Sequence, residues 1–155
     1  MRIVIVNGAE CSGKTAYIKK YANDWIKQYD LGWYNFLEEV EMKIIFTSLN
    51  IIHIECTIDN RIRMAQLLNT IAAAVETRDK TKHKEETIIE LVCPVCTKEQ
   101  FKANLGQLYD CNEMQLNDRV NYAFKMQTDI SKLMTSVEYY KYPLNFVKLD
   151  TLYNN

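Results

Sequence analysis

The sequence predicts a single α/β domain over residues 1–155, with a mostly parallel five-stranded sheet between two layers of helices. Runs of β-branched residues, typical of strands buried on both faces, alternate along the chain with amphipathic helical patterns. Strands that alternate with helices of ten or more residues favour a parallel sheet covered on both sides. The composition, 48% hydrophobic and 25% charged, suits one globular domain with its own core.

The expected elements follow one another from end to end. Strand-like runs lie at 2–7, 42–47, 51–58, 87–93, 109–116 and 145–150. Helical patterns lie at 14–29, from 59 or 60 to 75, at 97–108 and at 118–137. Residues 30–41 give no clear pattern, and the charged, apolar-free segment 77–86 is expected to be a solvated loop or a frayed helix end.

Charge and cysteine content exclude some classes of function. The net charge of −1 argues against nucleic-acid binding driven by a large basic field. No run approaches the 18 apolar residues of a membrane span, and the N-terminus lacks the pattern of a signal peptide. Five cysteines, an odd number, are typical of a reduced chain, so we expect a cytoplasmic location.

The strongest motif is the phosphate-binding P-loop, GxxxxGK[ST], at residues 8–15. It reads Gly8, Ala9, Glu10, Cys11, Ser12, Gly13, Lys14 and Thr15. A hydrophobic strand precedes it and a helix follows, as the motif requires. The loop amides and the helix N-terminus would cradle phosphates, Lys14 would reach the β- and γ-phosphates, and the Thr15 hydroxyl would bind Mg²⁺. We therefore expect ATP and Mg²⁺ to bind here.

Three further segments extend the motif to a family resemblance. The helix Asn60–Leu68 (NRIRMAQLL) is similar to the ENIRRIAEVAKLL helix of adenylylsulfate kinases. The strand Leu91–Pro94 (LVCP) resembles their strand that runs into FISP, and the residues from Tyr142-Pro143 to Asp150-Thr151 resemble their YE-P…LDT ending. The chain thus resembles the P-loop kinases of nucleotides and small molecules, which also include nucleoside monophosphate and polynucleotide kinases.

The resemblance implies a kinase that transfers the γ-phosphoryl group of ATP to a nucleotide-like acceptor or a metabolite hydroxyl. Asp59, after a predicted strand, is our candidate acid for orienting or deprotonating the acceptor hydroxyl or for a water-mediated Mg²⁺ contact. It could equally cap the next helix, and the two roles are compatible. Arg61 and Arg63 lie two apart on a helix, so at most one can face an acceptor phosphate. Arg119 lies where related kinases carry lid arginines and is the candidate for stabilising transferred charge, with a plain surface arginine as the alternative.

Two other functions stay open. A P-loop without an obvious catalytic acid also fits a non-catalytic nucleotide-binding or regulatory protein. Cys93-Pro94-Val95-Cys96, between a strand and a helix, resembles a dithiol redox site, and buried structural thiols are the alternative. As partners we expect a small-molecule acceptor and neither a membrane nor nucleic acid, while a homodimer stays open.

Overall fold

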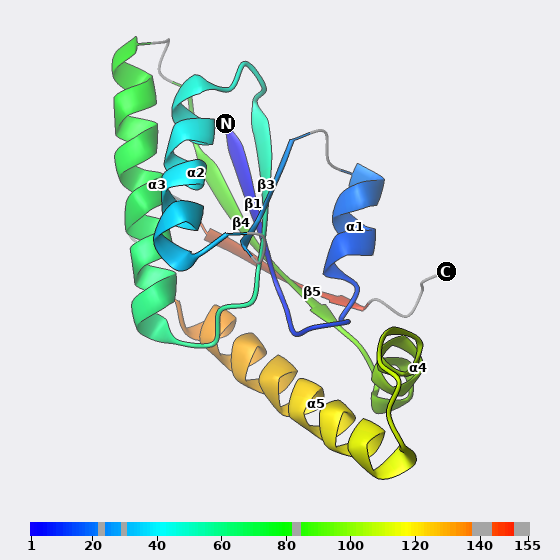
Figure 1. The fold of residues 1–155 in the computed structure, drawn as a ribbon. Coiled ribbons are helices and arrows are strands. Elements are labelled where there is room, and N and C mark those ends of the chain that lie inside the picture. The colour runs from blue at the N-terminus through cyan, green and yellow to red at the C-terminus, as the bar shows by residue number, and fades with distance from the viewer. Residues whose placement is uncertain (22–23, 29–30, 82–84, 138–143, 151–155) are drawn as a thin grey trace.

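The computed structural model describes residues 1–21, 24–28, 31–81, 85–137 and 144–150. Its strands are β1 (Arg2–Asn7), β2 (Trp25–Lys27), β3 (Ile51–Cys56), β4 (Ile88–Val95) and β5 (Leu144–Asp150). Its helices are α1 (Lys14–Tyr21), α2 (Trp33–Phe46), α3 (Arg61–Thr81), α4 (Lys98–Leu108) and α5 (Glu113–Ser136). The strands form one parallel sheet in the order β2-β3-β1-β4-β5 (Figure 1). The predicted α/β class with a five-stranded parallel sheet is confirmed.

The direction of each connection between consecutive strands determines which face of the sheet its helix covers. The chain moves one way across the sheet from β1 to β2 and the opposite way in every later connection. Because parallel crossovers are right-handed, this reversal puts α1 on one face and α2, α3 and α5 on the other. The core agrees, since Ile18 of α1 packs with Val4, Val6 and Val92, whereas the second face carries the larger cluster of buried residues.

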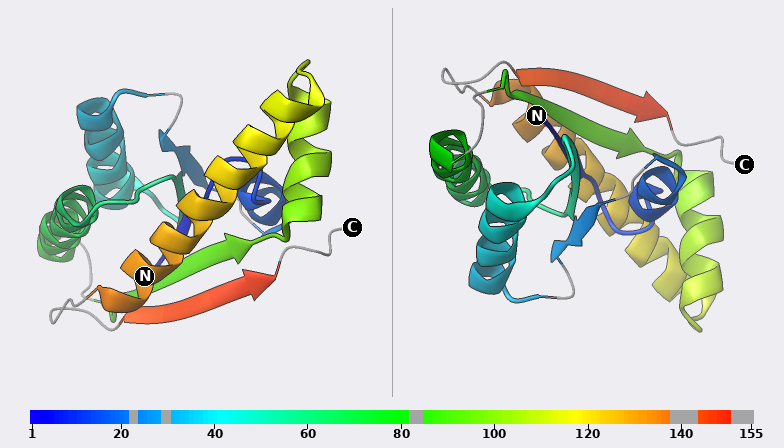
Figure 2. Two further views of the ribbon diagram at one scale, coloured as in Figure 1. Left: turned by 90° about the horizontal axis from the view of Figure 1, so that it is seen from below. Right: turned by 90° about the horizontal axis from the view of Figure 1, so that it is seen from above.

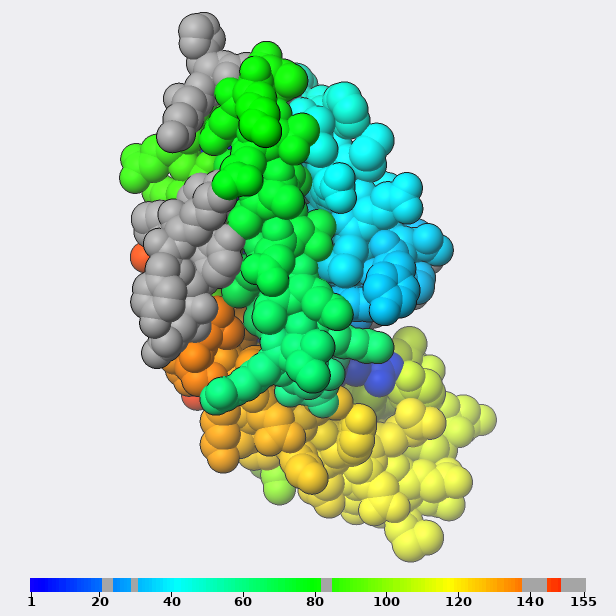
Figure 3. Space-filling view, turned by 90° about the vertical axis from the view of Figure 1, so that its left-hand side faces the viewer, coloured from blue at the N-terminus to red at the C-terminus, as the bar shows by residue number. Residues whose placement is uncertain are grey.

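The second face is formed mainly by long helices. In Figure 3, α3 (green) lies alongside α2 (cyan), and α5 (orange to yellow) lies across their lower end. Alternate residues of the central strands, among them Ile5, Ile54 and Leu91, are almost completely buried beneath them. Seen from below and above, α4 and α5 form a helix pair whose junction lies beyond the carboxyl end of β4 (Figure 2). None of the helices in the described ranges is both long and apolar enough to cross a bilayer.

Two predicted elements in the first half of the chain were wrong. The helix expected over 14–29 ends at Tyr21, and Trp25–Lys27 forms the edge strand β2 paired with β3. Trp25 and Ile26 continue the helical spacing, but residues of this type also favour strands. Pairing with β3, which is distant in the sequence, makes this segment a strand. The strand expected over 42–47 is instead the last part of α2, because a short apolar run does not by itself distinguish strand from helix.

Two further boundaries differ in the second half. The strand expected over 109–116 is absent, because Asn112 and Gln115 form a capping box that begins α5. The segment 77–86, expected as a solvated loop or a frayed helix end, begins as helix, because α3 continues to Thr81. Arg78 explains this difference: its buried guanidinium donates to the carbonyl oxygens of Ile44 and Thr47, so an apolar-free stretch of helix is still held against α2.

Candidate nucleotide-binding site

The loop between β1 and α1 has the backbone that a phosphate cradle needs. Gly13 has a φ of 96°, in the region that favours glycine, and Cys11 adopts a φ of 61°. Gly8 is required for space, because a Cβ atom there would lie 2.7 Å from Ser12 Oγ and 3.2 Å from Pro94 Cδ. The two glycines of the motif therefore act differently, one through its dihedral angle and one through close approach.

The loop lies at the point where the sheet reverses its winding. β1 and β3 are neighbours, α1 leaves β1 on one face, and α3 leaves β3 on the other. Ligands of open parallel sheets bind in the crevice at the carboxyl ends of such strands. A pocket of about 650 Å³ lies there, lined by Glu10, Cys11, Gly13, Lys14, Thr15, Ala16, Thr57, Asn104 and Leu108.

Lys14 is almost fully buried at the base of this pocket, 3% exposed. Its Nζ donates to the carbonyl oxygens of Gly8 at 2.9 Å and Cys56 at 3.3 Å, and to the hydroxyl of Thr57. Burial lowers the pKa of Lys14, and nearby negative groups, Glu55 among them, oppose that shift. The ammonium group of Lys14 is therefore held beside the carboxyl ends of β1 and β3.

Thr15, in the first turn of α1, donates a hydrogen bond of 2.6 Å to Oε1 of Glu55. Glu55 lies in β3 and is fully buried. Its Oε2 atom has no hydrogen-bond partner among the described residues. Burying a carboxylate oxygen without a hydrogen-bond partner costs free energy. We therefore expect this site to bind a positively charged ligand. The sequence analysis missed Glu55, although a charged residue inside the apolar run of 51–56 was a signal.

The residues present fit a bound magnesium ion. Mg²⁺ prefers oxygen ligands and is commonly held by one or two carboxylates together with substrate phosphates. Glu55 Oε2 and the Thr15 hydroxyl supply protein oxygens next to the loop that would hold phosphates. Among the described residues, no group of three or more His, Cys, Asp and Glu could hold a metal without such help. Thr15 and Glu55 would therefore hold the ion jointly with nucleotide.

Cys96, which follows β4, and Asn104 of α4 hold the backbone of the loop. Asn104 Nδ2 donates to the carbonyl of Cys11 at 3.0 Å, and Cys96 Sγ lies 3.3 Å from the carbonyl oxygen of Ser12. Asn104, which also lines the pocket, and Cys96 thus each hold one carbonyl group of the loop. Asn104 belongs to no recognisable motif, so the sequence alone could not identify it as a residue of the site.

A chain of three side chains joins the loop to α5. The Tyr109 hydroxyl donates to the carboxylate of Glu10, and the guanidinium of Arg119 stacks 3.9 Å from the centre of the Tyr109 ring. The hydrogen bond to Glu10 raises the pKa of Tyr109. Arg119 is therefore placed next to the P-loop, in the second turn of α5, although it does not line the pocket.

Asp59 lies outside this arrangement. β3 ends at Cys56, and Asn7 fixes the following loop by exchanging two hydrogen bonds with the backbone of Ile58. Asp59 is exposed beyond that anchor and does not line the pocket. The alternative role as helix cap is wrong, because Asn60 accepts the hydrogen bond from the Arg63 backbone amide.

The structure separates Arg61 and Arg63, as their spacing predicts. Arg63 lies over the ring of Trp33 from α2, with 5.0 Å between guanidinium carbon and ring centre. Arg61 borders a different hollow, between α3 and α5. Neither lines the pocket at the P-loop, and acceptor binding by either stays a prediction.

The thiols of the CPVC sequence lack the surroundings of a redox pair. Cys93 is completely buried, and burial raises its pKa to about 11. A reactive thiol needs the opposite shift. Cys96 is buried against the P-loop, and its backbone exchanges hydrogen bonds of 2.7 and 3.0 Å with the side chain of Gln127. These environments favour structural roles for both.

Comparison with known proteins gives a structural likeness to a designed protein. No protein-family model matches the chain, and no curated protein matches it either. Among solved structures, a de novo designed protein with a P-loop NTPase fold, determined by solution NMR, is similar to 90% of this chain over its own full length. The two are 14% identical, and the TM-score is 0.29.

The chain has an α/β fold with a five-stranded parallel sheet, and the description of the site rests on the geometry of this chain alone. The motif lies at the carboxyl end of β1, Lys14 is at its base, and Thr15 contacts an acidic residue of the neighbouring strand. Of the segments that resemble adenylylsulfate kinases, Tyr142, Pro143 and Thr151 lie outside the described residues.

Proposed function

We propose that the chain is an ATP-dependent phosphotransferase that moves the γ-phosphoryl group of ATP to a small nucleotide-like acceptor or a metabolite hydroxyl. The hydrogen bond between Thr15 and buried Glu55 carries the proposal. It supports a site for a cation at the foot of a phosphate cradle, which is the arrangement that phosphoryl transfer from a nucleotide needs.

The chemistry consists mainly of positioning and charge neutralisation. The acceptor oxygen forms a bond to the γ-phosphorus, the bond to the β,γ-bridging oxygen breaks, and ADP leaves. The proton of a hydroxyl acceptor passes to solvent water. Thr15 and Glu55 would hold Mg²⁺ together with nucleotide, and the ion would supply neutralisation of phosphate charge. Lys14 would contact the β- and γ-phosphate oxygens once it leaves its carbonyl partners, and Arg119 would move from Tyr109 to the transferred group.

The α4 helix supports a role in closing the site. Asn104 and Leu108 of α4 line the same pocket as Lys14, and Leu108 is 60% exposed. An apolar side chain at the mouth of a phosphate site helps to exclude water, which protects the phosphoryl group from hydrolysis. We assign α4 to the wall that faces the nucleotide.

A second function is nucleotide binding without turnover. The pocket wall contains one carboxylate, Glu10, and it accepts a hydrogen bond from Tyr109. Within the described residues no other acid lines the pocket that could act as a base toward an acceptor. This observation favours a regulatory protein in which nucleotide binding itself is the signal. The identity of the acceptor, a cytoplasmic location and a homodimer stay predictions.

A screen for acceptor-stimulated ADP release separates the two functions. Purified protein with Mg²⁺ and ATP is incubated with nucleosides, nucleotides and phosphorylatable metabolites, and ADP is measured by a coupled assay. The wild type should release ADP in the presence of one acceptor class. Lys14→Ala should abolish the release, while Lys19→Ala, an exposed lysine of the same helix, should retain it. Nucleotide binding without ADP release for any acceptor would favour the regulatory function.

A further inference from the structure

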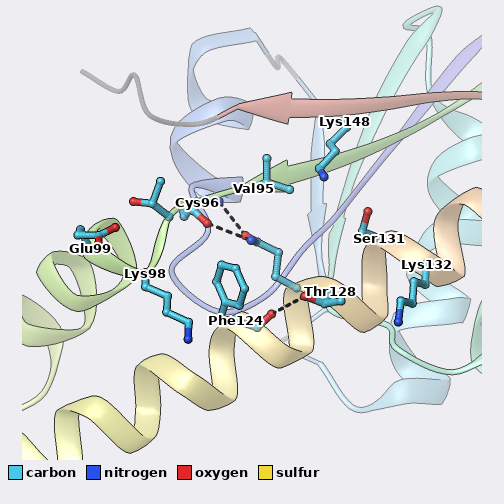
Figure 4. A pocket seen from close by; sticks show the side chains of 11 residues that line it. Val95, Cys96, Lys98, Glu99, Phe124, Thr128, Ser131, Lys132 and Lys148 are labelled. Carbon is cyan, nitrogen blue, oxygen red and sulfur yellow. Dashed lines mark hydrogen bonds between the residues drawn. The ribbon is translucent and has the colours of Figure 1, made fainter.

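A second pocket, distinct from the one at the P-loop, lies where β4, β5, α4 and α5 meet (Figure 4). Its volume is about 790 Å³. It is lined by Val95, Cys96, Thr97, Lys98, Glu99, Phe124, Gln127, Thr128, Ser131, Lys132 and Lys148. None of these residues lines the P-loop pocket, so a ligand here would have its own contacts.

Positive charge dominates this pocket. Lys98, Lys132 and Lys148 come from α4, α5 and β5, and Glu99 is the one carboxylate in the wall. Within the described part of the chain, none of the three lysines forms an ion pair. The excess of lysines is local, since the whole chain has a net charge of −1. Three amines around one hollow favour an anionic ligand with more than one charge.

The lysines are held at the pocket by their elements. Lys148 is paired in register with Cys93, and cross-strand neighbours share a face of the sheet. Cys93 packs in the cluster that contains residues of α5, so Lys148 lies on the side of the sheet that α5 covers. Lys98 Nζ lies 5.2 Å from the centre of the Phe124 ring, a cation–π contact between two residues that line the pocket.

The remaining lining defines the chemistry of the ligand. Phe124 and Val95 offer apolar surface, and Ser131 presents a hydroxyl between Lys132 and Lys148 (Figure 4). Gln127 holds the wall in place through its two hydrogen bonds with Cys96, whose Sγ contacts the P-loop at Ser12. The pocket thus lies against the back of the nucleotide site, separated from it by Cys96.

We propose that this lysine pocket is a second anion-binding site, for a small ligand that carries a phosphate or diphosphate group and an apolar part. The lysines bind the phosphate oxygens as point charges, the Ser131 hydroxyl donates to one of them, and Phe124 contacts the apolar part. The site is separate from the P-loop and does not depend on catalysis.

An NMR titration with inorganic pyrophosphate tests the proposal. Amide signals of the ¹⁵N-labelled chain report on both sites in one experiment: Lys98, Thr128 and Ser131 for the lysine pocket, Gly13 and Lys14 for the P-loop. We expect saturable shifts in the first group with their own dissociation constant. Exchanging both Lys132 and Lys148 for Gln should weaken that constant about tenfold, since two exposed charge contacts are lost, and should leave the P-loop constant unchanged.

A matched control tests whether pyrophosphate binding depends only on the overall positive charge of the surface. Lys125 is an exposed lysine of α5 outside the pocket, and Lys125→Gln should leave both constants unchanged. The proposal is overturned if pyrophosphate shifts the P-loop amides alone. Equal weakening in Lys125→Gln and in the double variant would overturn it too, because binding would then follow overall charge.

Discussion

The hydroxyl of Thr15 donates a 2.6 Å hydrogen bond to Glu55, a carboxylate buried in the neighbouring strand. The contact joins the first turn of α1 to the end of β3 across the reversal point of the sheet. Because Glu55 Oε2 lacks a partner among the described residues, the pair is arranged for a cation and is poorly suited to a purely structural role.

Glu55→Gln should separate these two roles. The neutral amide keeps the shape and can still accept from Thr15, so the metal-free protein should be as stable as the wild type or more stable. Affinity for ATP in the presence of Mg²⁺ should fall by about 10- to 100-fold, as for losses at metal sites generally. Thermal unfolding with and without Mg²⁺ and ATP measures both effects.

Glu39→Gln, an exposed exchange on α2, is the control and should change neither quantity. A less stable metal-free protein whose response to Mg²⁺ is unchanged would make Glu55 a structural residue.

Lys14 predicts a pH dependence of nucleotide binding. Burial lowers its pKa below the ordinary lysine value, and phosphate binding needs the charged form. Affinity for ADP should therefore fall as pH rises through this lowered pKa, before ordinary lysines lose their protons. Calorimetric titrations from neutral into alkaline solution measure it, and Lys14→Arg should bind with no such dependence because its side chain stays charged.

The lowered pKa of Lys14 affects folding stability in the opposite direction from nucleotide affinity. Between the lowered folded pKa and the unfolded value of 10.5, the unfolded chain binds more protons at Lys14. The contribution of Lys14 to the free energy of unfolding therefore rises with pH in that window. Loss of affinity that simply tracks loss of stability would argue against Lys14 as the cause.

Two glycines should respond to alanine in opposite directions. Gly8→Ala places a Cβ atom 2.7 Å from Ser12 Oγ and 3.3 Å from Lys14 Cγ, so we expect a loss of about 1–3 kcal/mol of stability together with loss of ATP binding. Gly106→Ala, inside α4, meets nothing nearer than 3.7 Å and should gain up to about 1 kcal/mol. Denaturant unfolding compares them, and a tolerated Gly8→Ala would refute the close packing of the loop.

Arg119 should affect turnover more than binding. If its guanidinium moves from the Tyr109 ring to the transferred phosphoryl group, Arg119→Ala should lower kcat by about 100-fold or more and leave ATP affinity nearly unchanged. The assay uses the acceptor found in the ADP-release screen. Lys125→Ala, further along the same helix, should retain full kcat. An unchanged kcat in Arg119→Ala would reduce Arg119 to a surface residue that stacks on Tyr109.

Local sequence was sufficient for the P-loop and for most of the parallel sheet. The motif places Lys14 and Thr15 without knowledge of the fold, and the β-branched runs place β1, β3 and β4 within a few residues. β2 could not be predicted, because three residues at a sheet edge become a strand only through pairing with His53–Glu55.

The acidic partner of the P-loop shows the same limit. Sequence reasoning chose Asp59 because it follows a predicted strand, whereas the carboxylate in contact with Thr15 is Glu55, inside the strand. Strand register decides the matter: Glu55 pairs with Val6, whose side chain packs with Ile18 of α1, so the carboxylate faces α1 and its Thr15. Tyr109 and Asn104 reach the loop through the placement of α4, which no local pattern encodes.

Calorimetric titration of Mg²⁺ and ATP into the wild type and Lys14→Ala tests the central claim most directly. Both proteins are first shown to be folded by circular dichroism, and Lys19→Ala is measured as the charge-matched control. The account predicts one-to-one binding in the wild type and in Lys19→Ala, dependence of that binding on Mg²⁺, and its loss in Lys14→Ala. Absence of binding in the wild type, or equal affinity in Lys14→Ala, would contradict a nucleotide site at this P-loop.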